Sequence, residues 1–168
     1  MLTMLAKLLK ILNSEDSPAA VGWAISLAFV FALLPLFSLA KWLVLVAVLL
    51  LRVNLSAFLL FSAVFAVLAW LFDPLLNDFG MWLLTLPALK DFWIAVSQSS
   101  VGGALALNNT LALAALLLSV LVLLPLYWIG VKLIYWYRSH IKSRIEKWRV
   151  VAVIKSSKIY QIYHSLNA

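Results

Sequence analysis

The sequence contains no cysteine and few charged residues. Of its 168 residues, 11% are charged, whereas a soluble protein carries about 25%. The absence of cysteine excludes disulfide bonds, thiolate nucleophiles and cysteine-ligated metal sites. The shortage of charge excludes an ordinary water-soluble domain, because the polar side chains are too few to cover the apolar remainder. Lipid must therefore be the solvent for much of the chain.

The residue patterns that carry catalysis are also missing. His140 and His164 have neither a carboxylate nor a second histidine at ligand spacing, so we expect no metal site. No glycine-rich phosphate loop is present, and no serine has a neighbouring histidine base within a recognisable nucleophile elbow. We therefore expect a protein that is not an enzyme and that needs no cofactor.

The charge that is present gathers in the C-terminal tail. Residues 132–168 hold eight basic residues against one acid, Glu146, which gives this tail the whole net charge of +7. Basic residues next to a membrane segment bind anionic lipid, and each is worth about 1 kcal/mol there. We expect lipid contacts at Lys142, Arg144, Lys147 and Arg149. We expect no nucleic-acid partner, because membrane attachment makes lipid headgroups the nearer anions.

The first half of the chain predicts a broken helical hairpin. Residues 1–13 have the spacing of a short amphipathic helix, and Ser17-Pro18 is a helix-start signal. Pro35 then divides the apolar segment 19–51 into two pieces of about 24 Å each, at 1.5 Å per residue. Each piece is short for a full crossing, so a hairpin that enters the membrane and returns fits better than two spans. A single kinked helix continuing to Leu51 is the alternative.

The second half predicts two membrane spans and a basic tail. The spans are 55–72, which Asp73-Pro74 is expected to stop, and 104–130. Residues 75–103 carry tryptophans in a mixed sequence that suits the headgroup region. Asn108, Asn109 and Thr110 are expected to form hydrogen bonds between helices. The predicted fold is an all-α membrane protein, with a membrane domain over 14–131 and a basic cytoplasmic tail over 132–168.

Charge also predicts the orientation in the membrane. Basic residues that flank membrane segments stay on the cytoplasmic side, which places the C-terminal tail inside. Lys7 and Lys10 place the N-terminus inside as well, and the acidic segment 73–103 can lie outside.

The candidate site is the turn Arg52-Val53-Asn54, between two apolar segments. A charge in the middle of a membrane costs about 2.5–3.5 kcal/mol on insertion scales, so Arg52 needs a reason to be there. In one interpretation it reaches lipid phosphates at the membrane surface. In the other, Arg52, Asn54 and Pro35 belong to a site for a lipid headgroup or a partner's acidic group. Asn54 would then orient the ligand or cap the helix that starts at Leu55.

Several motifs resemble a known family of bacterial membrane proteins, domain of unknown function 2062. They are Ser17-Pro18-Ala19-Ala20-Val21-Gly22-Trp23-Ala24-Ile25, Leu34-Pro35-Leu36 and Leu51-Arg52-Val53-Asn54-Leu55-Ser56-Ala57. The opening Met1–Lys10, Asp73-Pro74-Leu75, Asn108-Asn109-Thr110 and the closing Tyr160-Gln161-Ile162-Tyr163 are similar to a narrower subgroup. The chain departs from the usual pattern at Gly22-Trp23-Ala24-Ile25-Ser26, where many members have a second glycine.

The resemblance implies a function but no catalytic residue. The subgroup occurs in bacteria with an outer membrane, as one half of a two-gene pair beside a larger envelope protein. We therefore expect a small inner-membrane subunit that anchors or assists such a protein, in lipid transport toward the outer membrane. A small transporter or channel component is the alternative, since Leu33-Leu34-Pro35-Leu36 is echoed by Leu123-Leu124-Pro125-Leu126. An intramembrane enzyme is the second alternative.

Overall fold

The structure, a computed structural model, describes residues 17–142. Its helices in chain order are α2 (Pro18–Leu33), α3 (Leu39–Leu50), α4 (Leu55–Thr85), the 3-10 helix η1 (Pro87–Leu89), α5 (Lys90–Gln98), α6 (Ser100–Ala104), α7 (Thr110–Trp136) and the π-helical turn η2 (Tyr137–Lys142). This part of the chain contains no strand. The all-α fold predicted from the sequence is confirmed.

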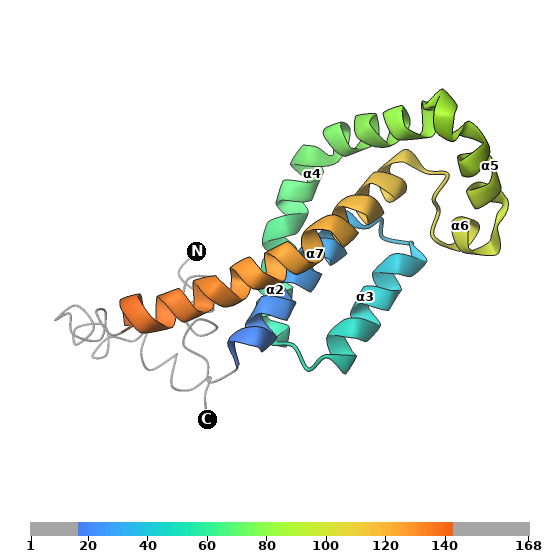
Figure 1. Cartoon of the computed structure of the whole chain (residues 1–168). Helices are drawn as coiled ribbons and strands as arrows, with labels where there is room; N and C mark the ends of the chain where they lie inside the picture. The colour runs from blue at the N-terminus through green and yellow to red at the C-terminus, as the bar shows by residue number, and fades with distance from the viewer. Residues whose placement is uncertain (1–16, 143–168) are drawn as a thin grey trace.

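Helix α2 lies at the centre of the bundle. Its sequence is apolar on every side, and a helix of that kind is stable only where neighbours or lipid surround it. Helices α3, α4 and α7 all pack against it. In Figure 1, α7 lies alongside α2, and α3 lies on a different side of α2. Most of α2 is therefore buried in the protein core.

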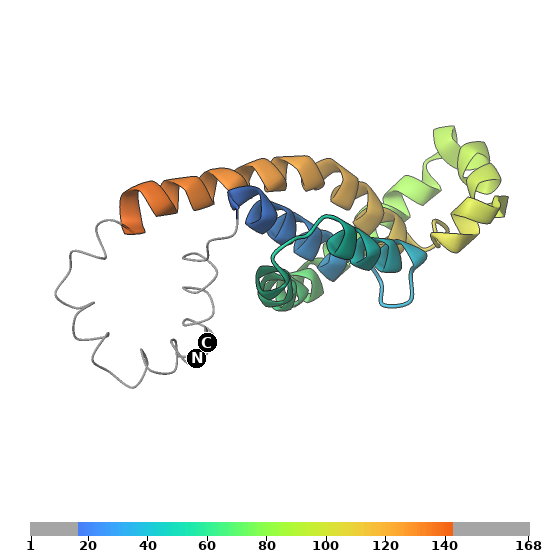
Figure 2. The same ribbon diagram turned by 90° about the horizontal axis from the view of Figure 1, so that it is seen from below.

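The contacts fix the direction of each helix. Ser26 of α2 donates a hydrogen bond from Oγ to the carbonyl oxygen of Leu123, and the earlier residue Gly22 meets the later residue Val131, so α2 and α7 run antiparallel. Helix α4 runs parallel to α2, because its start meets Ala20 and its Phe65 ring meets Phe29 further along. The beginnings of α2 and α4 and the end of α7 consequently lie at one end of the bundle, and α7 extends past it (Figure 2).

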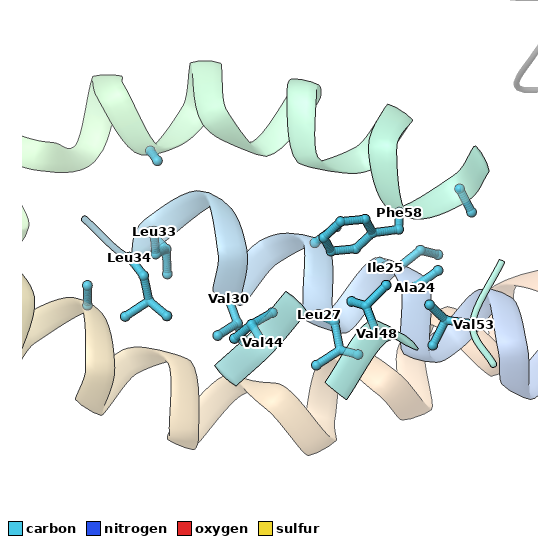
Figure 3. Close-up of a cluster of buried hydrophobic side chains, with 14 of the residues drawn as sticks. Ala24, Ile25, Leu27, Val30, Leu33, Leu34, Val44, Val48, Val53 and Phe58 are labelled. Carbon is cyan, nitrogen blue, oxygen red and sulfur yellow. The ribbon is translucent and has the colours of Figure 1, made fainter. Parts of the chain in front are cut away.

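The predicted hairpin is present. Ser17 caps α2 by accepting a hydrogen bond from the Ala20 N–H, and Pro18 opens the helix. The chain leaves α2 at Leu34, turns around Pro35 and re-enters a helix at Leu39. The buried face of α3 consists of Ala40, Val44 and Val48, at four-residue spacing. Figure 3 shows Val44 and Val48 pointing towards Val30 and Leu27 of α2.

The prediction that Asp73-Pro74 ends the helix of the span 55–72 is wrong. Helix α4 continues through Pro74 to Thr85 and forms an arc (Figure 1). A proline removes one backbone hydrogen bond, and the usual result inside a long helix is a bend. Buried residues on both sides of the proline, Ala69 before it and Leu76 and Gly80 after it, keep the helix docked.

The last long helix starts later than predicted, at Thr110 rather than Ala104. Asn109 accepts a hydrogen bond from the Ala112 N–H at 2.9 Å and so caps the new helix, whereas residues 105–109 form a turn after α6. Thr110 donates a 2.5 Å hydrogen bond to Asn77 Oδ1 of α4. The predicted hydrogen bonding between helices is thus confirmed for Thr110, while Asn109 acts as a cap.

The outer surface of the bundle is apolar over several helices. Helix α4 and the continuous helix Thr110–His140 are each long and apolar enough to cross a membrane. Leu59, Trp70, Val120 and Leu121 are among their large apolar residues that face outward. Apolar patches of this extent are rare on water-soluble proteins and are usual on lipid-facing surfaces. The fold is therefore that of an all-α membrane protein.

Of the segment 75–103 that was predicted to be interfacial, residues 75–85 continue α4, and the rest folds mainly into short helices. Helices α5 and α6 follow the end of α4, and Trp93 of α5 donates a hydrogen bond from Nε1 to the Leu83 carbonyl oxygen. The predicted N-terminal helix 1–13 and the tail beyond Lys142, including Arg144, Lys147 and Arg149, lie outside the described residues.

Candidate functional site

Arg52 sits in a turn whose backbone is fixed by its neighbours. Helix α3 ends at Leu50, and Arg52 adopts a φ of 48°, in the left-handed region. Helices commonly end on such a residue, but glycine usually occupies the position because a Cβ is disfavoured there. The Arg52 side chain is exposed.

Val53 and Asn54 tie this turn to the rest of the bundle. Val53 is buried in the core. Asn54 accepts a 2.6 Å hydrogen bond from the Ala57 N–H, and its own backbone N–H donates to the Ala20 carbonyl oxygen. The prediction that Asn54 caps the helix starting at Leu55 is confirmed. A ligand-orienting role for Asn54 stays a prediction.

Other basic residues of the described part of the chain lie towards the same end of the bundle as Arg52. The turn lies at the end of the bundle where α2 begins and α7 ends, and this end of α7 carries Lys132 and Arg138. Among the described residues, the acids Asp73, Asp78 and Asp91 lie on or beyond the second half of α4. Among residues 17–142, the charged groups placed towards this end are therefore cations, and an anion is the ligand that a guanidinium holds.

Pro35 does not join this site. It lies in the turn at the far end of α2, and its carbonyl oxygen accepts hydrogen bonds from the backbone N–H and the Oγ of Ser38. The two ends of α2 are about 24 Å apart at 1.5 Å per residue. The prediction that groups Pro35 with Arg52 and Asn54 is wrong in space, because the hairpin separates them.

Lys41 has a role at the Pro35 end that the sequence reasoning missed. Its Nζ donates a 3.0 Å hydrogen bond to the Leu34 carbonyl oxygen and lies 4.5 Å from the centre of the Phe31 ring. This amine thus caps the open C-terminal end of α2. The available signal was a single lysine in an apolar segment, seven positions after Leu34.

Small residues bring α2 and α7 close together. A Cβ on Gly22 would lie 2.5 Å from Cγ2 of Val131, and a Cβ on Gly130 would lie 3.2 Å from the Gly22 Cα. The rings of Trp23 and Tyr127 stack beside this crossing, 4.4 Å apart. Close backbone approach through small residues is the usual way in which membrane helices associate.

Comparisons with known proteins identify a distant relative. It is a protein of Treponema pallidum (strain Nichols), named "Uncharacterized protein", which is 27% identical over 159 residues. The match covers 95% of this chain and 98% of that protein, so the likeness runs through the whole helical bundle. No family model matches the chain, and no solved structure matches it. The resemblance to domain of unknown function 2062 stays a prediction.

Proposed function

We propose that this chain is a small subunit of the bacterial inner membrane that anchors or assists a larger cell-envelope protein. The observation that carries the proposal is the contrast between the core and the surface of the bundle. In residues 17–140 no charged side chain is buried, and the buried polar residues of the core are serines. Large apolar faces point outward, and these are suited to lipid and to the helices of a partner.

The same contrast disfavours a channel or transporter made by this chain alone. A pathway for a polar solute needs polar groups along the interior, and the helices surrounding α2 supply apolar side chains and close glycine contacts instead. No group of three histidine, aspartate or glutamate side chains gathers within the described part of the chain.

Within this proposal, the basic end of the bundle faces the cytoplasm, with both termini on that side. The positive-inside rule supports this orientation. Participation in lipid transport toward the outer membrane, and a partner encoded in the same gene pair, rest on the family resemblance. The shared chemistry of both expected ligands, a lipid phosphate or a partner's carboxylate, is that of an anion held by the two-pronged guanidinium of Arg52.

Affinity purification of the full chain from native membranes, with mass spectrometry of the bound proteins and lipids, tests the proposal. We expect a stoichiometric larger protein to be recovered. Recovery of the chain alone, together with solute flux through vesicles that contain only this chain, would favour the transporter instead.

Two substitutions at Arg52 distinguish binding of an anion by the guanidinium fork from the attraction that any cation has for lipid phosphates. Arg52→Lys keeps a cation but loses the planar fork, and Arg52→Gly removes the side chain while suiting the left-handed backbone. We expect both variants to insert at wild-type levels and to lose the bound partner or phospholipid. Lys90→Gln, which removes an exposed cation far from the turn, is the matched control. If the Arg52→Lys variant is recovered with the partner and the phospholipid at wild-type levels, contact of Arg52 with lipid phosphates explains its position fully. The site hypothesis is then abandoned.

A further inference from the structure

The α2–α3 hairpin is shorter than the helices beside it. From Ala20, level with the Arg52 turn, to Leu34 is 14 residues, or about 21 Å along the helix axis. Helices α4 and α7 have 31 and 27 residues, or about 46 Å and 40 Å at the same rise per residue. The hydrocarbon layer of a bilayer is about 30 Å thick. The hairpin therefore falls short of that thickness, whereas each of the two long helices has enough residues to cross it, α4 along its arc.

A basic group marks each end of the hairpin. Arg52 is exposed at one end. At the other, the amine of Lys41 lies level with the end of α2, because it donates to the Leu34 carbonyl oxygen. Between these charges, the outer face of α3 is apolar and includes Trp42, Leu43 and Leu49. Lysine and arginine settle at the level of the phosphates, so this face is apolar over only about 21 Å.

The tip of the hairpin consists of two residues whose exposure and backbone suit a membrane boundary. Leu36 and Phe37 are 73% and 97% exposed. Their backbone N–H groups have no acceptor within the described residues. Inside hydrocarbon such groups cost several kilocalories per mole each, so irregular backbone does not occur there facing lipid. The apolar side chains and open N–H groups both find partners where acyl chains meet headgroups.

We propose that the α2–α3 hairpin crosses a locally thinned bilayer, with the Leu36-Phe37 tip at the headgroup boundary of the second leaflet. The lipid beside α3 compresses by up to roughly 9 Å, the difference between the two lengths. On the other sides of the molecule, α4 and α7 meet a bilayer of ordinary thickness. The ligand of this surface is the bilayer itself, and the proposal stands independently of any partner protein.

The absence of cysteine makes the position of the tip directly measurable. Phe37→Cys changes an almost fully exposed residue and leaves the core intact. In vesicles of 18-carbon monounsaturated lipid, we expect the thiol of this variant to react with a membrane-impermeant maleimide from the face opposite to Lys132→Cys. Val120→Cys, on the outward face of α7, is the unreactive reference within the membrane. In 22-carbon lipid the reaction at position 37 should slow, while that at position 132 stays constant.

A spin label attached to the Phe37→Cys variant distinguishes the other outcomes. In one outcome, the label is accessible to oxygen but not to a water-soluble nickel complex, and the thiol at position 37 does not react. The tip then lies within the hydrocarbon, and thinning of the bilayer is excluded. If the label is inaccessible to both oxygen and the nickel complex, protein covers the tip. This result also overturns the proposal. Lys41→Leu removes the cation that holds the tip at the boundary, so adding this change should abolish the reaction at position 37, whereas Lys41→Arg should retain it.

Discussion

Arg52 and Asn54 are two positions apart, yet the structure gives them different roles. Arg52 ends α3 in a left-handed conformation, and its side chain is exposed. Asn54 holds the first turn of α4 through the Ala57 N–H, and Val53 between them is buried. The Arg-Val-Asn motif thus ends one helix, anchors the turn and begins the next helix, while leaving a guanidinium available for an anion.

Replacing the cap residue should lower stability. We expect Asn54→Ala to reduce the free energy of unfolding by about 1 kcal/mol, because the Ala57 N–H loses its acceptor. Asn54→Asp keeps an oxygen at the same place and should remain close to wild type. Unfolding in detergent, followed by circular dichroism, measures the difference. Equal stability of the alanine and wild-type proteins would show that the cap contributes nothing.

At the scale of helices, the crossing of α4 and α7 depends on Gly80. A Cβ added there would overlap the backbone carbonyl of Thr110, which belongs to the capped start of α7 and cannot give way as a flexible side chain would. Gly80→Ala should therefore destabilise the protein by about 1–3 kcal/mol, as overpacking usually does. Gly103 has nothing within 4 Å of its added Cβ, so Gly103→Ala is the matched control. The same detergent unfolding assay compares them, and similar losses in both variants would contradict the close crossing.

Local signals in the sequence correctly predicted the starts of α2 and α4 and the break between α2 and α3. Ser17-Pro18, Pro35 and Asn54 each act through neighbours within a few positions, so their effects are readable from the chain itself. Pro74 acts differently, because burial of Leu76 and Gly80 against other elements decides whether the helix ends there or bends. The sequence contains no sign of that burial.

Contacts between distant segments were beyond the sequence reasoning for the same reason. Gly22 meets Gly130 across more than a hundred positions, and Ser26 meets Leu123 across 97. Nothing in one sequence links these residues. The candidate site was recognised by the cost of its charge, which is local, but its separation from Pro35 followed only from the arrangement of α2.

At the scale of the whole molecule, charge is distributed unequally along the bundle. Arg52, Lys132 and Arg138 lie towards one end. Asp73, Asp78 and Asp91 lie on α4 beyond its midpoint or on α5. We expect a reporter fused after Ala168 to be active only in the cytoplasm. The thiol of a Lys90→Cys variant, exposed on α5, should react with an impermeant reagent from the periplasm. Periplasmic activity of the fusion would overturn this orientation.

The central position of α2 has a consequence for how the protein is made. The hydroxyl of Ser26 donates to the carbonyl oxygen of Leu123 in the finished bundle, and Leu123 is synthesised 97 residues later. At about 5–20 residues per second of synthesis, α2 spends roughly 5–20 s beside the ribosome and the insertion machinery without α7. Helix α2 therefore gains its last neighbour only when α7 has been made, and a nascent chain that ends before Thr110 lacks the helix that packs against Gly22.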